Sequence, residues 1–283
     1  MRHVVSPEQR DFYHRHGYVC LRQVLPDAVI ELGKSIAGQW AEKTIGGWLR
    51  EGLITDGRRD LDLSHRLATV WEAAGRPQYL RSPRRDLVGP TMYRFLTHPT
   101  LLDIAEDLLD TPEIASFAIF AARPKLPDQL WTDTPWHQDA QYYRDAEHVH
   151  VVSMWAPLVS VDEQNSCLQV APDMHRGKLY EEETDETGFR GIPKAERAAL
   201  KGISIPMQAG DLLCFNQKTP HRALPNRTDT VRWSLDVRYG AAPTRVARDS
   251  ELSFIARSAA NPAGVETSEQ WIAKWADRPE GTF

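Results

Sequence analysis

The stretch TVRWSLDVRY, residues 230–239, alternates apolar and polar side chains. This period of two predicts a β-strand whose two faces differ in character. Its apolar face consists of Val231, Trp233, Leu235, Val237 and Tyr239. Its polar face consists of Arg232, Ser234, Asp236 and Arg238. A face with four polar residues in line borders either solvent, which is the ordinary case, or a polar lumen inside a barrel.

Short apolar runs of similar length occupy the chain from residue 114 onwards, separated by Pro, Gly and Asn. They are ASFAIFAA (115–122), HVVSMWAPLV (150–159), CLQVAP (167–172), ISIPM (203–207) and DLLCFN (211–216). Strands at this spacing favour a sandwich or barrel over a parallel sheet wound with helices. We therefore expect a mainly β fold with flanking helices, a double-stranded β-helix or jelly roll of the cupin type, over residues 114–245.

Helical patterns dominate the first 113 residues. SPEQRDFYHRHG (6–17) has a capping box at its start and a terminal glycine, and a strand, YVCLRQVL (18–25), follows it. LPDAVIELGKSIAGQWAEK (25–43) and HPTLLDIAEDLLD (98–110) predict two more helices. Residues 45–90 are polar and are expected to form an elaborated surface or lid. We expect one domain over 1–283, with a charged, lid-like insertion at 177–202 and a C-terminal extension at 246–283.

Composition limits the classes of partner. The chain has 283 residues, 41% of them hydrophobic, and a net charge of -5. The like-charge cluster YEEETDE (180–186) is acidic, which argues against nucleic acid. No apolar run has the length of a membrane span or signal peptide, and the three cysteines are scattered among apolar residues. We therefore expect a soluble, cytoplasmic protein, with no membrane and a small-molecule substrate.

Two residues of TPWHQDAQYYR (134–144) suggest a metal site. In an extended segment His137 and Asp139 project to one side, with α-carbons roughly 6.6 Å apart, so an imidazole and a carboxylate can converge on one ion. Two imidazoles and one carboxylate form the facial triad of non-haem iron(II) oxygenases. His221, after the strand DLLCFN, is a candidate for the second imidazole, with a strand-end histidine bonded to backbone as the alternative. His148 and His150 lack the following glutamate of a cupin motif and are expected to be structural.

Arg232 and Ser234 offer the other half of such a site. A guanidinium fork pairs with both oxygens of a carboxylate, and a hydroxyl adds a donor. An oxygenase that uses a dicarboxylic 2-oxo acid needs such a pair about one molecule's length from its iron.

Together these segments resemble the phytanoyl-CoA dioxygenase family of iron(II)- and 2-oxoglutarate-dependent oxygenases. The matching motifs are WHQD, NSCLQVAPDMHRG, AGDLLCF and PHRALPNRTDTVRWS, together with the opening FYHRHGYVCLRQVL. The likeness covers most of the chain and thins out at 45–90, at 177–202 and beyond about 245. NSC stands where relatives usually have Asn-Gly.

The resemblance implies His137, Asp139 and His221 as iron ligands and Arg232 as the group that grips the distal carboxylate of 2-oxoglutarate. Ser234 extends it to the Arg-x-Ser form. Further residues implied near the cosubstrate are Trp155, for which core packing is the alternative, Gln138, expected to support the site without ligating, and Ile119, expected on the strand before the motif. His175 is taken as structural.

The expected activity is hydroxylation or a related oxidation of an unactivated C–H bond in a small organic substrate. It uses Fe(II), 2-oxoglutarate and O2 and releases succinate and CO2. The presence of Asp139 favours this over halogenation, which needs a small residue there. Several aromatic residues are expected to wall the pocket: Trp131, Trp136, Tyr142 and Tyr143. The alternative from another class is a cupin-type metal protein that is not an oxygenase, either an isomerase or a binding protein.

Overall fold

The computed structural model describes residues 3–77, 83–129, 134–143, 149–185, 188–242 and 250–279. Within these ranges the α-helices are α1 (Pro7–His16), α2 (Asp27–Arg50), α3 (Leu63–Ala73), α4 (Arg84–Leu87), α5 (Pro90–Leu96), α6 (Pro99–Leu109), α7 (Lys194–Arg197) and α8 (Ser268–Ala273). Short 3-10 helices are η2 (Asp139–Tyr142), η3 (Ser250–Leu252) and η4 (Pro262–Gly264).

Two antiparallel sheets form the β core. The larger has the order β1 (Tyr18–Leu21), β9 (Leu212–Asn216), β4 (Val151–Pro157), β11 (Arg232–Ala241), β2 (Ile114–Ser116) and β12 (Phe254–Arg257), with β3 (Ala121–Lys125) also paired to β11. The smaller has the order β10 (His221–Ala223), β5 (Leu168–Val170) and β8 (Ile203–Ile205). A separate ribbon pairs β6 (Glu183–Thr184) with β7 (Arg190–Gly191) inside the insertion.

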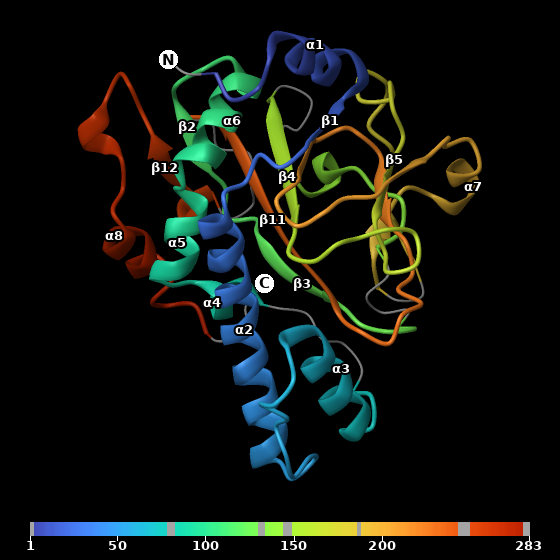
Figure 1. The fold of residues 1–283 in the computed structure, drawn as a ribbon. Coiled ribbons are helices and arrows are strands. Elements are labelled where there is room, and N and C mark those ends of the chain that lie inside the picture. Colours follow the sequence, from blue (N-terminus) through green and yellow to red (C-terminus); the bar gives the residue numbers. More distant parts are fainter. Residues whose placement is uncertain are drawn as a thin grey trace.

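Strand β11 lies at the centre of the larger sheet and is buried on both faces. Its apolar residues belong to the main core beneath the helices, where Trp233 meets Trp40 of α2 edge to face at 5.9 Å. The Tyr239 hydroxyl donates to the carbonyl of Leu96 in α5. Figure 1 shows α2, α5 and α6 on one side of this sheet and β5 of the smaller sheet on the other. The polar face of β11 therefore faces the space between the two sheets. Of the two predicted environments for this face, the polar lumen is correct and solvent is wrong.

The first helix forms as its sequence predicts. Ser6 and Gln9 make a reciprocal capping box, and Gly17 ends α1 in the left-handed region at φ 79°. The following strand β1 is shorter than predicted, because the chain turns at Gln23, whose φ is 46°.

The prediction of a surface region at 45–90 is wrong for much of its described part. Helix α2 runs on to Arg50, beyond the predicted end at residue 43, and α3 lies against it. Their buried residues join the main core: Ile45, Trp48, Leu67, Val70 and Trp71. Gly33 allows α2 to approach the sheet closely, since a β-carbon there would lie 2.5 Å from Leu158.

The run ASFAIFAA forms two strands where one was predicted. Ser116 pairs with Tyr239, and Ala121 pairs with Asp236, so residues 117–120 lie opposite only two residues of β11. The extra residues form a bulge that re-aims the chain. Ile119 lies in this bulge, half-buried, and not on a strand as predicted.

Among the described residues, no helix combines the length and hydropathy that a membrane span requires.

Candidate metal centre

Three buried side chains meet at one end of the space between the sheets. One ligand atom from each of His137, Asp139 and His221 lies within 4.8 Å of the others. Nε2 of His137 is 3.7 Å, and Nε2 of His221 is 3.9 Å, from Oδ1 of Asp139. The structure thus brings together the three residues that the sequence proposed as ligands, although the two histidines are 84 positions apart.

Local backbone contacts aim both imidazoles. His137 and His221 form an isolated antiparallel bridge, with each backbone NH donating to the other's carbonyl at 3.0 Å. Nδ1 of His137 is 2.9 Å from the carbonyl of Pro135, and Nδ1 of His221 is 3.0 Å from that of Thr219. These contacts fix the tautomer that carries its proton on Nδ1. Nε2 of each ring is left as the acceptor, as a metal ligand requires.

The protonation states also suit a divalent cation. Burial, followed by the neighbouring His221, lowers the pKa of His137 to about 3, and burial lowers the pKa of His221. Burial opposes the charge on Asp139, but Arg238 and the two histidines outweigh it and hold the pKa of this carboxyl below its ordinary value. Two neutral imidazoles and one carboxylate therefore face each other at neutral pH.

The Asp139 carboxylate is held from behind by strand residues. Ser153 Oγ donates to Oδ2 at 2.5 Å, and Arg238 donates through Nε to Oδ2 at 3.1 Å and through Nη2 to Oδ1 at 3.2 Å. Arg238 also pairs with Asp236, which accepts a two-pronged contact from Arg123 at 2.9 and 3.1 Å. Two arginines and two aspartates thus alternate along a chain of ion pairs that ends on the ligand.

Arg232 lies on the same strand face and is almost fully buried. Its Nη1 donates to Ser234 Oγ at 2.7 Å, its Nη2 to Ser166 Oγ at 3.2 Å, and its guanidinium lies 5.3 Å from the ring centre of Trp155. Its Nε has no hydrogen-bond partner, and within the described ranges no carboxylate forms an ion pair with it. Burial, followed by Arg123, lowers its pKa to about 9. Among the described residues this cation has no anionic partner, so it is available to pair with the anionic group of a ligand.

Ser166 explains the departure from Asn-Gly in the NSC motif. Its φ of 76° is in the left-handed region, where glycine is the ordinary choice. The hydroxyl that serine adds donates to the carbonyl of Leu224 and accepts from Arg232. The strained backbone is therefore offset by hydrogen bonds that glycine cannot make.

Gln138 faces away from the cluster, as the alternation of side chains predicted. Its amide nitrogen donates to the carbonyls of Lys178 and Lys218, and its amide oxygen accepts from the backbone NH of Tyr180. Gln141 adds two bonds to the carbonyls of Tyr180 and Glu181. The segment that carries two candidate ligands is therefore fastened to the insertion.

The remaining predicted pocket residues lie in different places. Tyr142 lies with its ring centre 6.1 Å from that of His137, and its hydroxyl donates to the carbonyl of Arg190. Trp136 is buried against the insertion, in a cluster with Tyr180 and Ile192, and does not wall the centre. Tyr143 packs with a small apolar cluster at the start of β4. Ile119 lies half-buried in the bulge between β2 and β3, and Trp131 lies outside the described residues.

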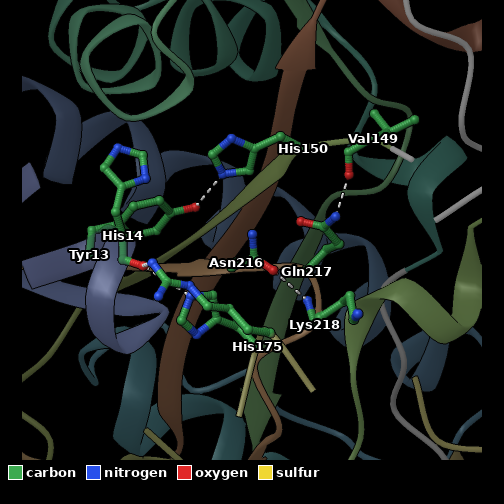
Figure 2. Close-up of a pocket in the computed structure, with 9 residues that line it drawn as sticks. Tyr13, His14, Val149, His150, His175, Asn216, Gln217 and Lys218 are labelled. Atoms are coloured by element: carbon green, nitrogen blue, oxygen red, sulfur yellow. Dashed lines mark hydrogen bonds between the residues drawn. The ribbon is translucent and has the colours of Figure 1, made fainter. Parts of the chain in front are cut away.

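A cavity of about 410 Å³ brings His14 together with His150 and His175, two histidines that were expected to be structural. It is lined by Tyr13, His14, Val149, His150, His175, Arg176, Asn216, Gln217 and Lys218. Figure 2 shows the Tyr13 hydroxyl pointing at the His150 ring, a contact of 3.0 Å. Burial, followed by His14, lowers the pKa of His150 to about 4. None of the three residues of the metal cluster lines this cavity.

Sequence reasoning missed four residues around the site: Arg123, Ser153, Ser166 and Arg238. Arg238 had a signal, because it shares the polar face of its strand with Arg232 and Ser234. Ser153 had none, since a lone serine in an apolar run is common. Its role becomes visible only where β4 is paired with β11, which places Ser153 opposite Arg238.

Known proteins provide an independent comparison. Residues 13–234 match the family model described as phytanoyl-CoA dioxygenase. A probable phytanoyl-CoA dioxygenase of Caenorhabditis elegans is 22% identical over 245 residues, which cover 83% of this chain and 75% of that protein. A 1-deoxypentalenic acid 11-beta-hydroxylase of Streptomyces arenae is 26% identical over 243 residues, 80% of this chain and 78% of that protein.

Among solved structures, the epimerase SnoN in complex with Fe3+, alpha ketoglutarate and nogalamycin RO superposes with a TM-score of 0.54. The alignment covers 88% of this chain and 84% of that one at 19% identity. At this identity the superposition shows a common fold. It confirms the predicted mainly β jelly roll with flanking helices.

Proposed function

The chain belongs to the phytanoyl-CoA dioxygenase family, and from this premise we propose that it hydroxylates an unactivated C–H bond of a small organic substrate. The membership confirms the predicted class of enzyme, a non-haem iron- and 2-oxoglutarate-dependent oxygenase. The observation that carries the assignment to residues is that two features face one lumen: the His137–Asp139–His221 cluster, and the guanidinium of Arg232, which forms no ion pair with any described residue.

The cluster fits iron(II). Two neutral imidazole nitrogens and one carboxylate oxygen form the ligand set of the facial triad, which leaves positions on the metal for other ligands. The backbone bridge between His137 and His221 and the contacts of their Nδ1 atoms would hold the rings in place before a metal arrives.

The surroundings of Arg232 fit the distal carboxylate of 2-oxoglutarate. A buried cation is costly unless it is paired, and here the pairing groups within the described chain are two hydroxyls and an indole face. A carboxylate offered by a ligand would supply the missing charge and accept from the free Nε. Ser234 and Trp155 would complete the binding site, whereas Gln138 would support it through the insertion.

Bound iron and 2-oxoglutarate supply the oxidation of a C–H bond by O2, with release of succinate and CO2. The chain's own residues would bind and orient the metal and the cosubstrate, and would exclude water from them. The two histidines and Asp139 would hold the metal, and Arg232 would fix the cosubstrate at one end. The three metal-cluster residues and Arg232 are all almost fully buried, so the reaction would proceed away from bulk solvent.

We further propose that the insertion at 177–202 helps to select the substrate. Tyr142 stands between the metal cluster and this insertion, and Arg190 lies over its ring at 5.2 Å. The hydroxylase of Streptomyces arenae acts, by its name, on 1-deoxypentalenic acid, so organic acids are reasonable substrates to screen. A cytoplasmic location remains part of the proposal, supported by three free cysteines.

Anaerobic addition of iron(II) and 2-oxoglutarate tests the proposal. The wild-type protein should develop the weak visible charge-transfer band of the chelate, and His137→Ala and Arg232→Met should each abolish or strongly weaken it. Succinate release across a panel of small acids then identifies the substrate. Absence of the band in the wild type would refute the proposed function, whereas its persistence in both variants would refute the assignment of His137 and Arg232 to the site.

A further inference from the structure

We propose that Arg238 is a positioning residue that presents Asp139 to the metal through one oxygen, Oδ1. The proposal rests on the proposed metal centre, and it assigns a role to a residue that the family motif does not supply. Its basis is the unequal surroundings of the two carboxylate oxygens.

The two oxygens of Asp139 have different neighbours. Oδ1 faces both imidazoles, at 3.7 and 3.9 Å, and accepts one guanidinium contact at 3.2 Å. Oδ2 accepts from Ser153 at 2.5 Å and from Arg238 Nε at 3.1 Å, with Nη2 at 3.0 Å. The donors therefore occupy Oδ2 and leave a lone pair of Oδ1 directed at the histidines. A carboxylate held in this way binds a metal through one oxygen, which keeps further positions open for a chelating ligand.

Arg238 is itself fixed. It is 5% exposed, and its Nη1 is paired with Asp236, which is held in turn by both arms of Arg123. The guanidinium is thus supported on both sides by carboxylates. It cannot rotate away from Asp139 without leaving a buried charge on Asp236 or Asp139 with fewer partners. This rigidity distinguishes a positioning group from a surface ion pair.

The charge of Arg238 and its orienting role predict opposite changes in metal affinity when the residue is removed. A guanidinium 3.0–3.2 Å from a ligand carboxylate repels a cation bound to that carboxylate, so its removal would strengthen metal binding if charge were its main effect. If orientation is its main effect, removal weakens metal binding. The direction of the change therefore separates the two roles.

The experiment titrates metal-free protein with cobalt(II) and follows the visible absorption of the complex, at a pH near neutrality. Arg238→Met should bind cobalt about 10–100-fold more weakly than the wild type, the usual effect of losing a partner that orients a ligand. Arg238→Lys, which keeps the charge without the planar fork, should fall between them. The control is Arg66→Met: it removes a buried arginine that pairs with Glu42 and not with Asp139, and should stay within about threefold of the wild type.

Each outcome of the titration either supports or overturns the positioning role of Arg238. Unchanged or tighter cobalt binding in Arg238→Met overturns the inference, as does an equal loss in Arg66→Met. If circular dichroism shows that Arg238→Met does not fold, Arg238→Lys and Ser153→Ala carry the test, since each removes part of the donor set on Oδ2. Failure of the wild type to bind cobalt, or equal binding by His137→Ala, would instead refute the metal centre and with it the proposed function.

Discussion

Replacing Arg232 by methionine should abolish 2-oxoglutarate binding while leaving the stability of the ligand-free protein nearly unchanged. The fall of its pKa from 12.5 to about 9 corresponds to roughly 5 kcal/mol against the charged form. The variant also loses two hydrogen bonds from a charged group, each worth about 1.5–3 kcal/mol. These terms nearly cancel. We expect the free energy of unfolding to change by less than about 2 kcal/mol, against the 3–5 kcal/mol typical of breaking a buried pair.

Thermal unfolding of the nickel-loaded protein, with and without 2-oxoglutarate, measures both effects. At about 100 times its Kd the ligand should stabilise the wild type by about 2.7 kcal/mol, which raises Tm by about 5 °C in a protein of this size. Arg232→Met should show no rise. The control is Arg66→Met, which removes a buried arginine whose ion-pair partner is Glu42 and not a residue of the site. It should lower Tm yet keep the rise. A normal rise in Arg232→Met, or a loss of more than about 4 kcal/mol without ligand, would refute the reasoning.

Three further predictions concern the neighbouring structure. Ser166→Ala should lower the free energy of unfolding in urea by about 1–3 kcal/mol, because Arg232 loses a buried hydrogen-bond partner. Ser166→Gly should lower it less, since glycine adopts the positive φ without strain, and the reverse order would contradict this account. Burial holds the pKa of His150 at about 4, so between pH 6.5 and pH 4 the unfolded chain binds a proton at this residue and the folded chain does not. The free energy of unfolding should therefore fall by up to about 3 kcal/mol over this range, and His150→Asn should reduce that loss. Gln138→Leu should speed limited proteolysis within residues 177–202, because three bonds to the insertion or its neighbours are lost; an unchanged cleavage rate would show that the other contacts suffice.

The sequence predicted the features that depend on local periodicity. Alternation predicted β11, and the same rule placed His137 and Asp139 on one side with Gln138 on the other, because side-chain direction in extended chain follows from covalent geometry. The capping box predicted the start of α1 for a similar reason: Ser6 and Gln9 are three residues apart. Such signals need no knowledge of the rest of the molecule.

The features that escaped prediction depend on how strands pair. Arg238 meets Asp139 across 99 residues, and Ser153 reaches the same carboxylate only because β4 lies beside β11 in one register. The bulge at Ile119 likewise arises from a mismatch between β2, β3 and their partner, which no single run reveals. Alternation alone left open whether the polar face of β11 met solvent, since that depends on the second sheet.

The polar face of β11 also sets a fixed distance between two groups of the site. Residues two apart in a strand are separated by about 6.6 Å, and this spacing hardly varies because it is set by bond lengths and angles. The proposed cosubstrate site at Arg232 and the proposed support of Asp139 at Arg238 are therefore kept at a constant separation by three such steps. Pairing with β3 and β4 on either side prevents the strand from slipping. Insertions or deletions here would destroy both functions at once, so new substrate preferences should arise in the insertion and other loops, where length can change without altering that separation.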